Sequence, residues 1–180
     1  MENQYMVLPQ EAPEIGEFYC PWCATKQRTH LNVYTVYCDS CGRELTHNGK
    51  SQHMPEGPEL QQCSDEQLLF MLQQFCPASK AYRLAYKIAE AVPDKKHIVY
   101  TAAQVLHRFE PLSGDGWKMM ADLACKPYYP ALVYMYNHLF SEDLEQTDLL
   151  RPVCELLVLK FGNQTAADTL RTILRKDGKR

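Results

Sequence analysis

The chain has 180 residues, of which 46% are hydrophobic and 23% are charged, and its formal net charge is -3. These proportions are typical of a globular protein with a buried core, and the length suits one domain or a small module joined to a medium one. The acidic balance disfavours a dedicated nucleic-acid-binding domain, because such domains are usually basic. No apolar run reaches the roughly 18 residues of a membrane-spanning helix. The N-terminus also lacks the basic and apolar regions of a secretion signal. We therefore expect a cytoplasmic protein without a membrane partner.

After a predicted N-terminal tail (residues 1–16), a cysteine-rich segment (residues 17–53) contains two identically spaced cysteine pairs. Cys20 and Cys23 form one C-x2-C turn, and Cys38 and Cys41 form the other after fourteen intervening residues. Two such turns joined by a hairpin make a tetrahedral four-sulfur site whose size suits Zn²⁺. In a reducing compartment, paired cysteines bind metal more often than they form disulfides. The spacing therefore predicts one structural zinc ion.

Other uses of the four cysteines are weaker hypotheses. Iron in an electron-transfer site would take the same ligands. A redox disulfide would need a thiol of lowered pKa in a thioredoxin-like setting, and no βαβ pattern surrounds either pair. Catalytic zinc keeps an open coordination position, whereas this set is complete. We interpret the nearby His30, His47 and His53 as surface or strand-edge residues rather than ligands.

The sequences "CPWC" and "CDSCG" resemble the two knuckles of a rubredoxin-type zinc ribbon, with Ala24 where the first knuckle often has glycine. The resemblance implies a small β module around the metal. The alternation in "HLNVYTVYC" (residues 30–38) independently predicts a strand. We expect no strand after Tyr37.

Beyond a segment with glycine and proline that we interpret as a linker (residues 54–63), apolar residues recur at helical spacing. Ser64 to Gln67 match a capping box, which predicts the first helix, and Pro77 predicts its end. Further helices are expected at residues 79–92, 96–109, 115–125, 129–140, 147–161 and 165–176. The predicted fold class is mainly α: a small β zinc ribbon and an all-α domain (residues 64–180) of about six or seven helices in short-looped hairpins.

Two segments about 35 residues apart share a pattern that indicates a helical repeat. Each has a helix, a short break and a second helix with alanine in its first turn, where a small residue lets helices approach closely. The pattern resembles Sel1-like repeats, relatives of the tetratricopeptide repeat. The resembling positions are Trp117, Ala121, Ala131, Leu132, Tyr136, Gly162, Ala166 and Leu170. The resemblance implies a stack of helical hairpins; an irregular helical bundle is the alternative.

The sequence contains no phosphate-binding loop, nucleophile elbow or H-E-x-x-H motif. His107 and His138 lie in predicted helices without an evident acid or nucleophile partner, so we interpret them as structural. We therefore expect a protein that is not an enzyme.

Two groups of residues are candidates for binding a partner. A tyrosine group in or beside the 129–140 helix is a candidate protein-contact surface, with core packing as the alternative: Tyr128, Tyr129, Tyr134 and Tyr136. A basic C-terminus, together with Trp22 of the ribbon, is a candidate nucleic-acid contact: Arg175, Lys176, Lys179 and Arg180.

We expect an adaptor or regulator that binds a protein partner through the helical domain, the ribbon or both. The alternative is a zinc-ribbon factor associated with nucleic acid. The sequence does not define the oligomeric state.

Overall fold

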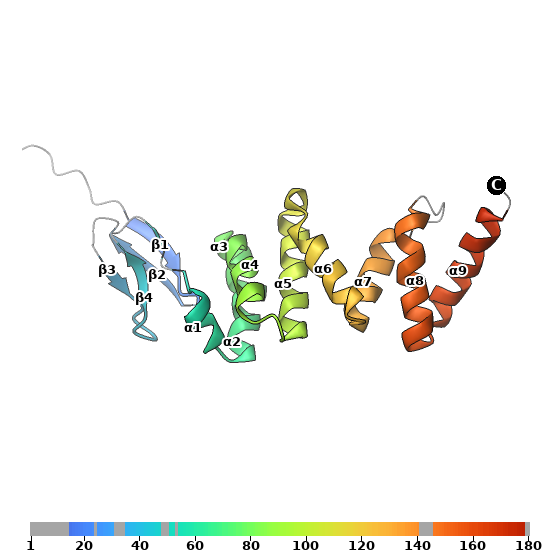
Figure 1. Cartoon of the computed structure of the whole chain (residues 1–180). Coiled ribbons are helices and arrows are strands. Elements are labelled where there is room, and N and C mark those ends of the chain that lie inside the picture. The colour runs from blue at the N-terminus through green and yellow to red at the C-terminus, as the bar shows by residue number, and fades with distance from the viewer. Residues whose placement is uncertain are drawn as a thin grey trace, which may run out of the picture. The chain divides into compact units, whose positions relative to one another are not determined.

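The computed structural model of the chain describes residues 15–23, 25–30, 35–47, 51–52, 54–140 and 146–178. The chain divides between Pro55 and Glu56 into two compact units, an N-terminal unit and a helical unit, and each is described by itself. Most of the described residues lie in helices, so the prediction of a mainly α protein is confirmed (Figure 1). No described helix is both long enough and apolar enough to cross a membrane.

The N-terminal unit contains two small antiparallel sheets. Strand β1 (Ile15–Tyr19) pairs with β2 (Lys26–His30). Strand β3 (Thr35–Tyr37) pairs with β4 (Glu44–His47), with a bulge between Val36 and Tyr37, and β4 pairs in turn with β5 (Ser51–Gln52).

Strand prediction was only partly correct in this unit. The strand expected within residues 30–38 corresponds to β3, while residues 31–34 lie outside the described residues. The expectation of no strand after Tyr37 is wrong, because β4 and β5 follow it. These short polar segments carry no apolar alternation, and they are strands because they pair in series with β3.

The helical unit begins inside the segment that we interpreted as a linker. Helix α1 (Gly57–Gln61) has a proline at its start, and the Glu59 carboxylate accepts a hydrogen bond from the N–H of Glu56 at 3.1 Å. Leu60 is fully buried. Proline in the first turn (Pro58) and an acidic residue at the third helical position (Glu59) are helix-start signals that the sequence interpretation passed over.

The next helical segment is longer than expected. It consists of α2 (Asp65–Phe70), a π-helical segment η1 (Met71–Phe75) and α3 (Cys76–Ser79). The capping box is confirmed, since Ser64 accepts a hydrogen bond from the N–H of Gln67. The expected end at Pro77 is wrong: in the widened π turn the N–H of Cys76 bonds to the carbonyl of Met71, and Pro77 then lies in the first turn of α3, where no N–H is needed.

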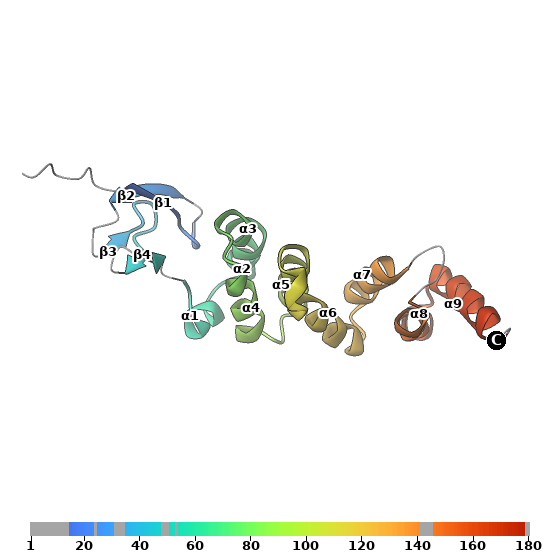
Figure 2. The same ribbon diagram turned by 90° about the horizontal axis from the view of Figure 1, so that it is seen from above.

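Six further helices follow in chain order, within one to three residues of the predicted ranges. They are α4 (Tyr82–Ala91), α5 (Lys96–Phe109), α6 (Asp115–Cys125), α7 (Tyr129–Leu139), α8 (Thr147–Phe161) and α9 (Gln164–Asp177), with a short 3-10 turn η2 (Pro111–Ser113) after α5. Each of these helices packs against the next (Figures 1 and 2). Their buried faces form the core of the unit, with fully buried side chains such as Ile98, Leu132 and Leu157.

The helices recur at regular intervals. Helices α4, α6 and α8 begin 33 and 32 residues apart, and α5, α7 and α9 begin 33 and 35 residues apart. Helices α5 and α6 approach each other closely at Gly116. A Cβ on Gly116 would lie 2.3 Å from the backbone nitrogen of His107, so only glycine permits this approach.

Candidate metal centre and helical groove

Two backbone turns present the four cysteines of the N-terminal unit. Residues 20–25 join β1 to β2, and residues 38–43 join β3 to β4. Both turns close with the same hydrogen bond: the N–H of Cys20 donates to the carbonyl of Thr25 at 3.0 Å, and the N–H of Cys38 donates to that of Arg43 at 2.7 Å. Gly42 adopts φ +71°, a conformation that glycine takes without strain. The two turns therefore share the hydrogen bond that closes them.

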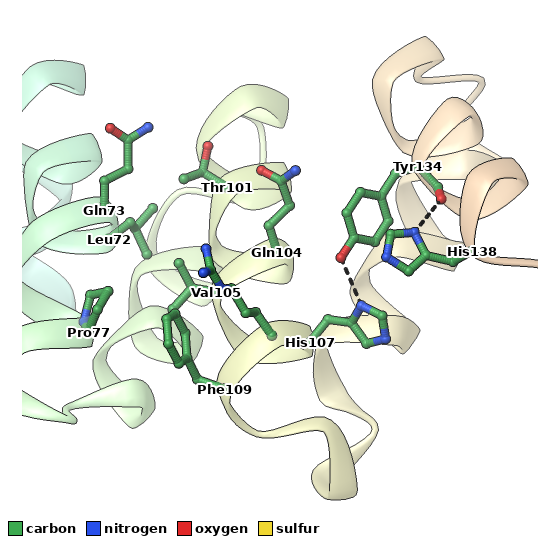
Figure 3. Close-up of a pocket in the computed structure, with 11 residues that line it drawn as sticks. Leu72, Gln73, Pro77, Thr101, Gln104, Val105, His107, Phe109, Tyr134 and His138 are labelled. Atoms are coloured by element: carbon green, nitrogen blue, oxygen red, sulfur yellow. Dashed lines mark hydrogen bonds between the residues drawn. The ribbon is translucent and has the colours of Figure 1, made fainter.

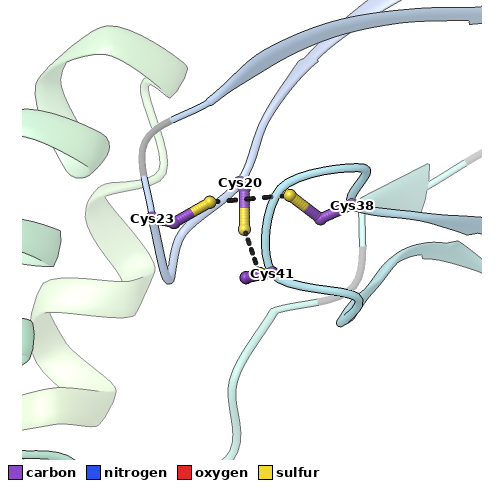
Figure 4. A group of neighbouring side chains, drawn as sticks. All are labelled: Cys20, Cys23, Cys38 and Cys41. Carbon is purple, nitrogen blue, oxygen red and sulfur yellow. Dashed lines mark hydrogen bonds between the residues drawn. The ribbon is translucent and has the colours of Figure 1, made fainter.

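The four sulfurs converge on one point (Figure 4). All of them lie within 4.8 Å of one another. The Sγ atoms of Cys20 and Cys41 are 3.6 Å apart, and those of Cys23 and Cys38 are 3.5 Å apart. Four sulfurs placed tetrahedrally at about 2.3 Å from a metal would lie about 3.8 Å from each other. The four cysteines predicted as ligands could therefore bind one metal ion together.

The thiols differ in their surroundings. Cys20 and Cys38 are buried, whereas Cys41 is exposed. Burial raises the pKa of Cys20 and of Cys41. Burial also acts to raise the pKa of Cys23, but hydrogen bonds with Thr25 and with the neighbouring cysteines outweigh it and lower that pKa to about 6. Cys23 thus favours the thiolate, the form that binds metals, whereas the raised pKa values of Cys20 and Cys41 favour their neutral thiols.

Trp22 packs against the buried cysteines rather than standing free. The guanidinium of Arg43 lies 4.0 Å from the centroid of its ring, so one face of the indole is already occupied by a cation–π contact. Elsewhere in the unit, Glu17 pairs with Lys26 at 2.6 Å and with Arg28 at 2.8 Å. Part of the positive charge that could contact phosphate is thus neutralised within the unit. Of the three nearby histidines, His30 and His47 lie in β2 and β4, and His53 lies outside the described residues.

The predicted tyrosine group connects α7 to α5 and α9, the second helix before it and the second after it. The hydroxyl of Tyr134 bonds to Nδ1 of His107 in α5 at 2.8 Å, and the hydroxyl of Tyr136 bonds to that of Thr169 in α9 at 2.8 Å. Tyr128, Tyr134 and Tyr136 pack against the core. Tyr129 is 43% exposed, with its ring 4.9 Å from that of Phe161.

The basic C-terminal residues lie at the end of α9. Arg175 and Lys176 are exposed in the last turn of that helix, where positive charge favours the helix dipole. Lys179 and Arg180 lie outside the described residues.

The helical unit also contains a groove that no sequence motif indicated. It has a volume of about 640 Å³ and is lined by η1, α3, α5 and α7 (Figure 3). Its floor includes the buried Leu72 and Val105. Its lining brings His107 and His138 together with Tyr134, which stacks on His138 with ring centroids 4.0 Å apart. These side chains come from helices separated in sequence, so only packing could bring them together.

Burial and the neighbouring His138 lower the pKa of His107. The ring of His107 is therefore neutral at physiological pH. Nδ1 of His138 bonds to the backbone carbonyl of Tyr134 at 2.8 Å, which fixes the second ring. None of the described residues that line the groove carries a carboxylate or a thiol. Its side chains are thus suited to hydrogen bonding and packing rather than to nucleophilic or paired-carboxylate chemistry.

The chain matches no protein-family model, no curated protein and no solved structure. The likenesses to zinc ribbons and to Sel1-like repeats therefore depend on the residues and the geometry of this chain alone.

Proposed function

We propose that this protein is a non-enzymatic adaptor or regulator, in which a zinc ribbon binds one structural Zn²⁺ and a stack of helical hairpins binds a protein partner. Three features support the proposal: the complete cysteine set, the recurrence of the helices and the groove.

The ribbon assignment is supported by the two equivalent C-x2-C turns and by sulfur separations of 3.5 and 3.6 Å. Thiolate ligands and tetrahedral spacing favour zinc, and four protein ligands leave no coordination position for a substrate. Zn²⁺ bound there would supply folding free energy to two sheets that are too small to build a core of their own.

The hairpin stack is supported by helix starts that recur every 32 to 35 residues. Ala131 and Ala166, which are 35 residues apart, occupy the third positions of α7 and α9 and are both buried. The bonds from Tyr134 to α5 and from Tyr136 to α9 join alternate helices, as expected where repeated hairpins stack. The recurrence includes α4 and α5, where the sequence pattern was weakest.

The observation that carries the functional proposal is the groove. An open recess of about 640 Å³ lined by several helices, with an apolar floor and polar rim, has the size and lining of a ligand site. Its described lining residues include no carboxylate and no thiol, which favours binding over chemistry, and helical stacks offer extended surfaces for partners.

The test is affinity capture from host-like lysate with the intact zinc-loaded protein, with and without nuclease treatment. A discrete protein retained after nuclease treatment, bound directly to purified bait, is the expected result. Tyr129→Ala should weaken that binding if the tyrosine group contributes, while circular dichroism stays unchanged because this ring is exposed. Retained material that consists of nucleic acid and vanishes with nuclease would contradict the adaptor proposal.

A nucleic-acid-associated factor is the second candidate, favoured by the exposed Arg175 and Lys176. It predicts binding that weakens steeply with salt and is lost when the four basic C-terminal residues are changed to glutamine. The contact between Trp22 and Arg43 reduces the ring surface available for stacking on bases, so we rank this candidate below the adaptor.

A further inference from the structure

The groove of the helical unit has a defined polar and apolar arrangement along α5. Thr101, Gln104 and Arg108 line it from successive turns of that helix. Seven residues of helix separate the first from the last, a rise of about 10 Å. This length matches about three residues of an extended peptide.

The groove offers hydrogen-bonding groups to the main chain of such a segment and an apolar surface to one of its side chains. Gln73 and Gln104 project from opposite walls, and each amide can donate and accept hydrogen bonds (Figure 3). Gln104 uses one donor on the hydroxyl of Tyr100 at 3.1 Å, which leaves its carbonyl oxygen and a second N–H. The floor contains Leu72 and Val105, with Phe109 beside them.

Arg108 gives the groove its charge. Its guanidinium lies 5.2 Å from the ring centroid of Phe109, and within the described part of the chain it has no carboxylate partner. Arg151 and Arg171, by contrast, each pair with a carboxylate on their own helix. Among the described residues, Arg108 has no carboxylate partner and the lining has no acid, which on a chain of net charge -3 favours a ligand that brings its own carboxylate.

The wall that supplies Leu72 and Gln73 is the π-helical segment η1. Single π turns are rare and occur frequently at functional sites, since they redirect side chains that a regular helix would place elsewhere. This is a second observation at the same location, independent of charge.

We propose that the groove binds an extended segment of a partner protein that carries an apolar residue two positions before an aspartate or glutamate, so that both side chains lie on one side of the segment. The apolar side chain packs on Val105 and on the exposed ring of Phe109, Arg108 binds the carboxylate, and Gln73 and Gln104 bind the main chain. This proposal rests on the proposed function, because it names the site and the partner chemistry of the same helical unit.

The test uses the full zinc-loaded protein and three pools of fluorescein-labelled decapeptides with random flanks. Their centres are Leu-x-Glu, Leu-x-Gln and Leu-x-Lys. In fluorescence polarisation we expect the glutamate pool to bind about tenfold more tightly than the glutamine pool, the usual effect of one charge-assisted contact. We expect the lysine pool to bind more weakly still.

Arg108→Ala should abolish the preference for glutamate over glutamine. A general loss of stability would weaken both pools alike and would leave this preference unchanged. Arg83→Ala is the matched control, because Arg83 is exposed on α4 and does not line the groove. Gln73→Ala with Gln104→Ala should weaken the glutamate and glutamine pools by the same factor. Melting curves of all variants should coincide with that of the wild type.

The proposal is overturned if the three pools bind alike, if none binds at millimolar concentration, or if Arg108→Ala keeps the preference for glutamate. Displacement of the glutamate pool by single-stranded oligo-dT at equal potency would also overturn it, because the site would then recognise anions in general. A partner captured from lysate equally by wild type and Arg108→Ala would leave the adaptor function standing and refute this groove as its site.

Discussion

The two units of the molecule differ in what fixes their backbones. In the N-terminal unit, the described hydrophobic cluster consists of Cys20 and Cys38 with Trp22 and Cys23 packed against it. In the helical unit, buried leucine, isoleucine, methionine and alanine side chains run through every helix from α4 to α9. Among the described side chains, packing in the first unit centres on a few sulfur atoms, whereas packing in the second consists of many small contacts. This difference predicts that perturbations of one unit leave the other intact.

The largest expected effect is loss of the metal. Cys20→Ser should reduce bound zinc from one ion per chain to none and abolish amide protection in β1 to β4, because metal binding supplies about 10 kcal/mol or more in small zinc modules. Mass spectrometry of metal content and hydrogen exchange provide the measurement. Cys125→Ser is the control, since Cys125 is exposed in the helical unit. If the amides of β1 and β2 stayed protected from exchange without metal, metal binding by the cysteines would not be what stabilises these strands.

The corresponding change in the helical unit is Gly116→Ala. The added Cβ would meet backbone atoms of His107 and Ala103 at 2.3 to 2.8 Å, and backbone cannot move aside as a flexible side chain can. We expect a loss of about 3 kcal/mol in the unfolding free energy of the helical unit, measured by urea denaturation, with zinc content unchanged. Gly57→Ala should be nearly neutral, because nothing lies within 4 Å of a Cβ there. Equal effects of the two substitutions would refute the close crossing of α5 and α6.

A smaller effect is expected from the bond that joins α7 to α9. Tyr136→Phe removes the hydroxyl that bonds to Thr169, a residue that is 8% exposed, and should lower the unfolding free energy by about 1 kcal/mol. Tyr129→Phe should change it little, because that hydroxyl makes only a 3.4 Å contact with the exposed Asn163 side chain. The opposite ranking of the two variants would contradict the arrangement of the tyrosine group.

The smallest effect concerns charge at the start of α2. Asp65 bonds to Lys95 at 2.6 Å and to His97 at 2.9 Å, and chiefly the hydrogen bond with Lys95 lowers the pKa of this carboxyl. The contribution of Asp65 to the unfolding free energy is therefore complete at pH values above 3.8, the ordinary pKa of aspartate. It is lost as the pH falls through the lowered pKa of the folded state. Asp65→Asn should lower the melting temperature slightly at neutral pH, and the difference from wild type should vanish in acid. Glu66→Gln makes the same charge change nearby and should have less effect, because none of the ion pairs of the described residues includes Glu66.

The regular features of the fold were the predictable ones. The helices from α4 to α9 were expected within one to three residues, because an apolar stripe at helical spacing and a proline or glycine at its end are local signals. The convergence of four sulfurs also followed from spacing, because a C-x2-C turn places both sulfurs on one side of its loop. The features that were missed have weak or conflicting local signals: β4 and β5 are short and polar, and the π turn of η1 carries the helix past a proline.

Sequence alone determined that the protein has a module in which four cysteines could bind a metal ion and a larger helical part, because cysteine spacing and apolar periodicity are properties of neighbouring residues. Tertiary structure alone decided the rest. It placed Tyr134 beside His107, although 27 residues separate them, and so made three of the four tyrosines packing residues of the helical stack. It also brought η1, α5 and α7 around one groove and left Arg108 there without a carboxylate partner in the described part of the chain. Such pairings depend on how whole helices cross, and no short stretch of sequence encodes a crossing.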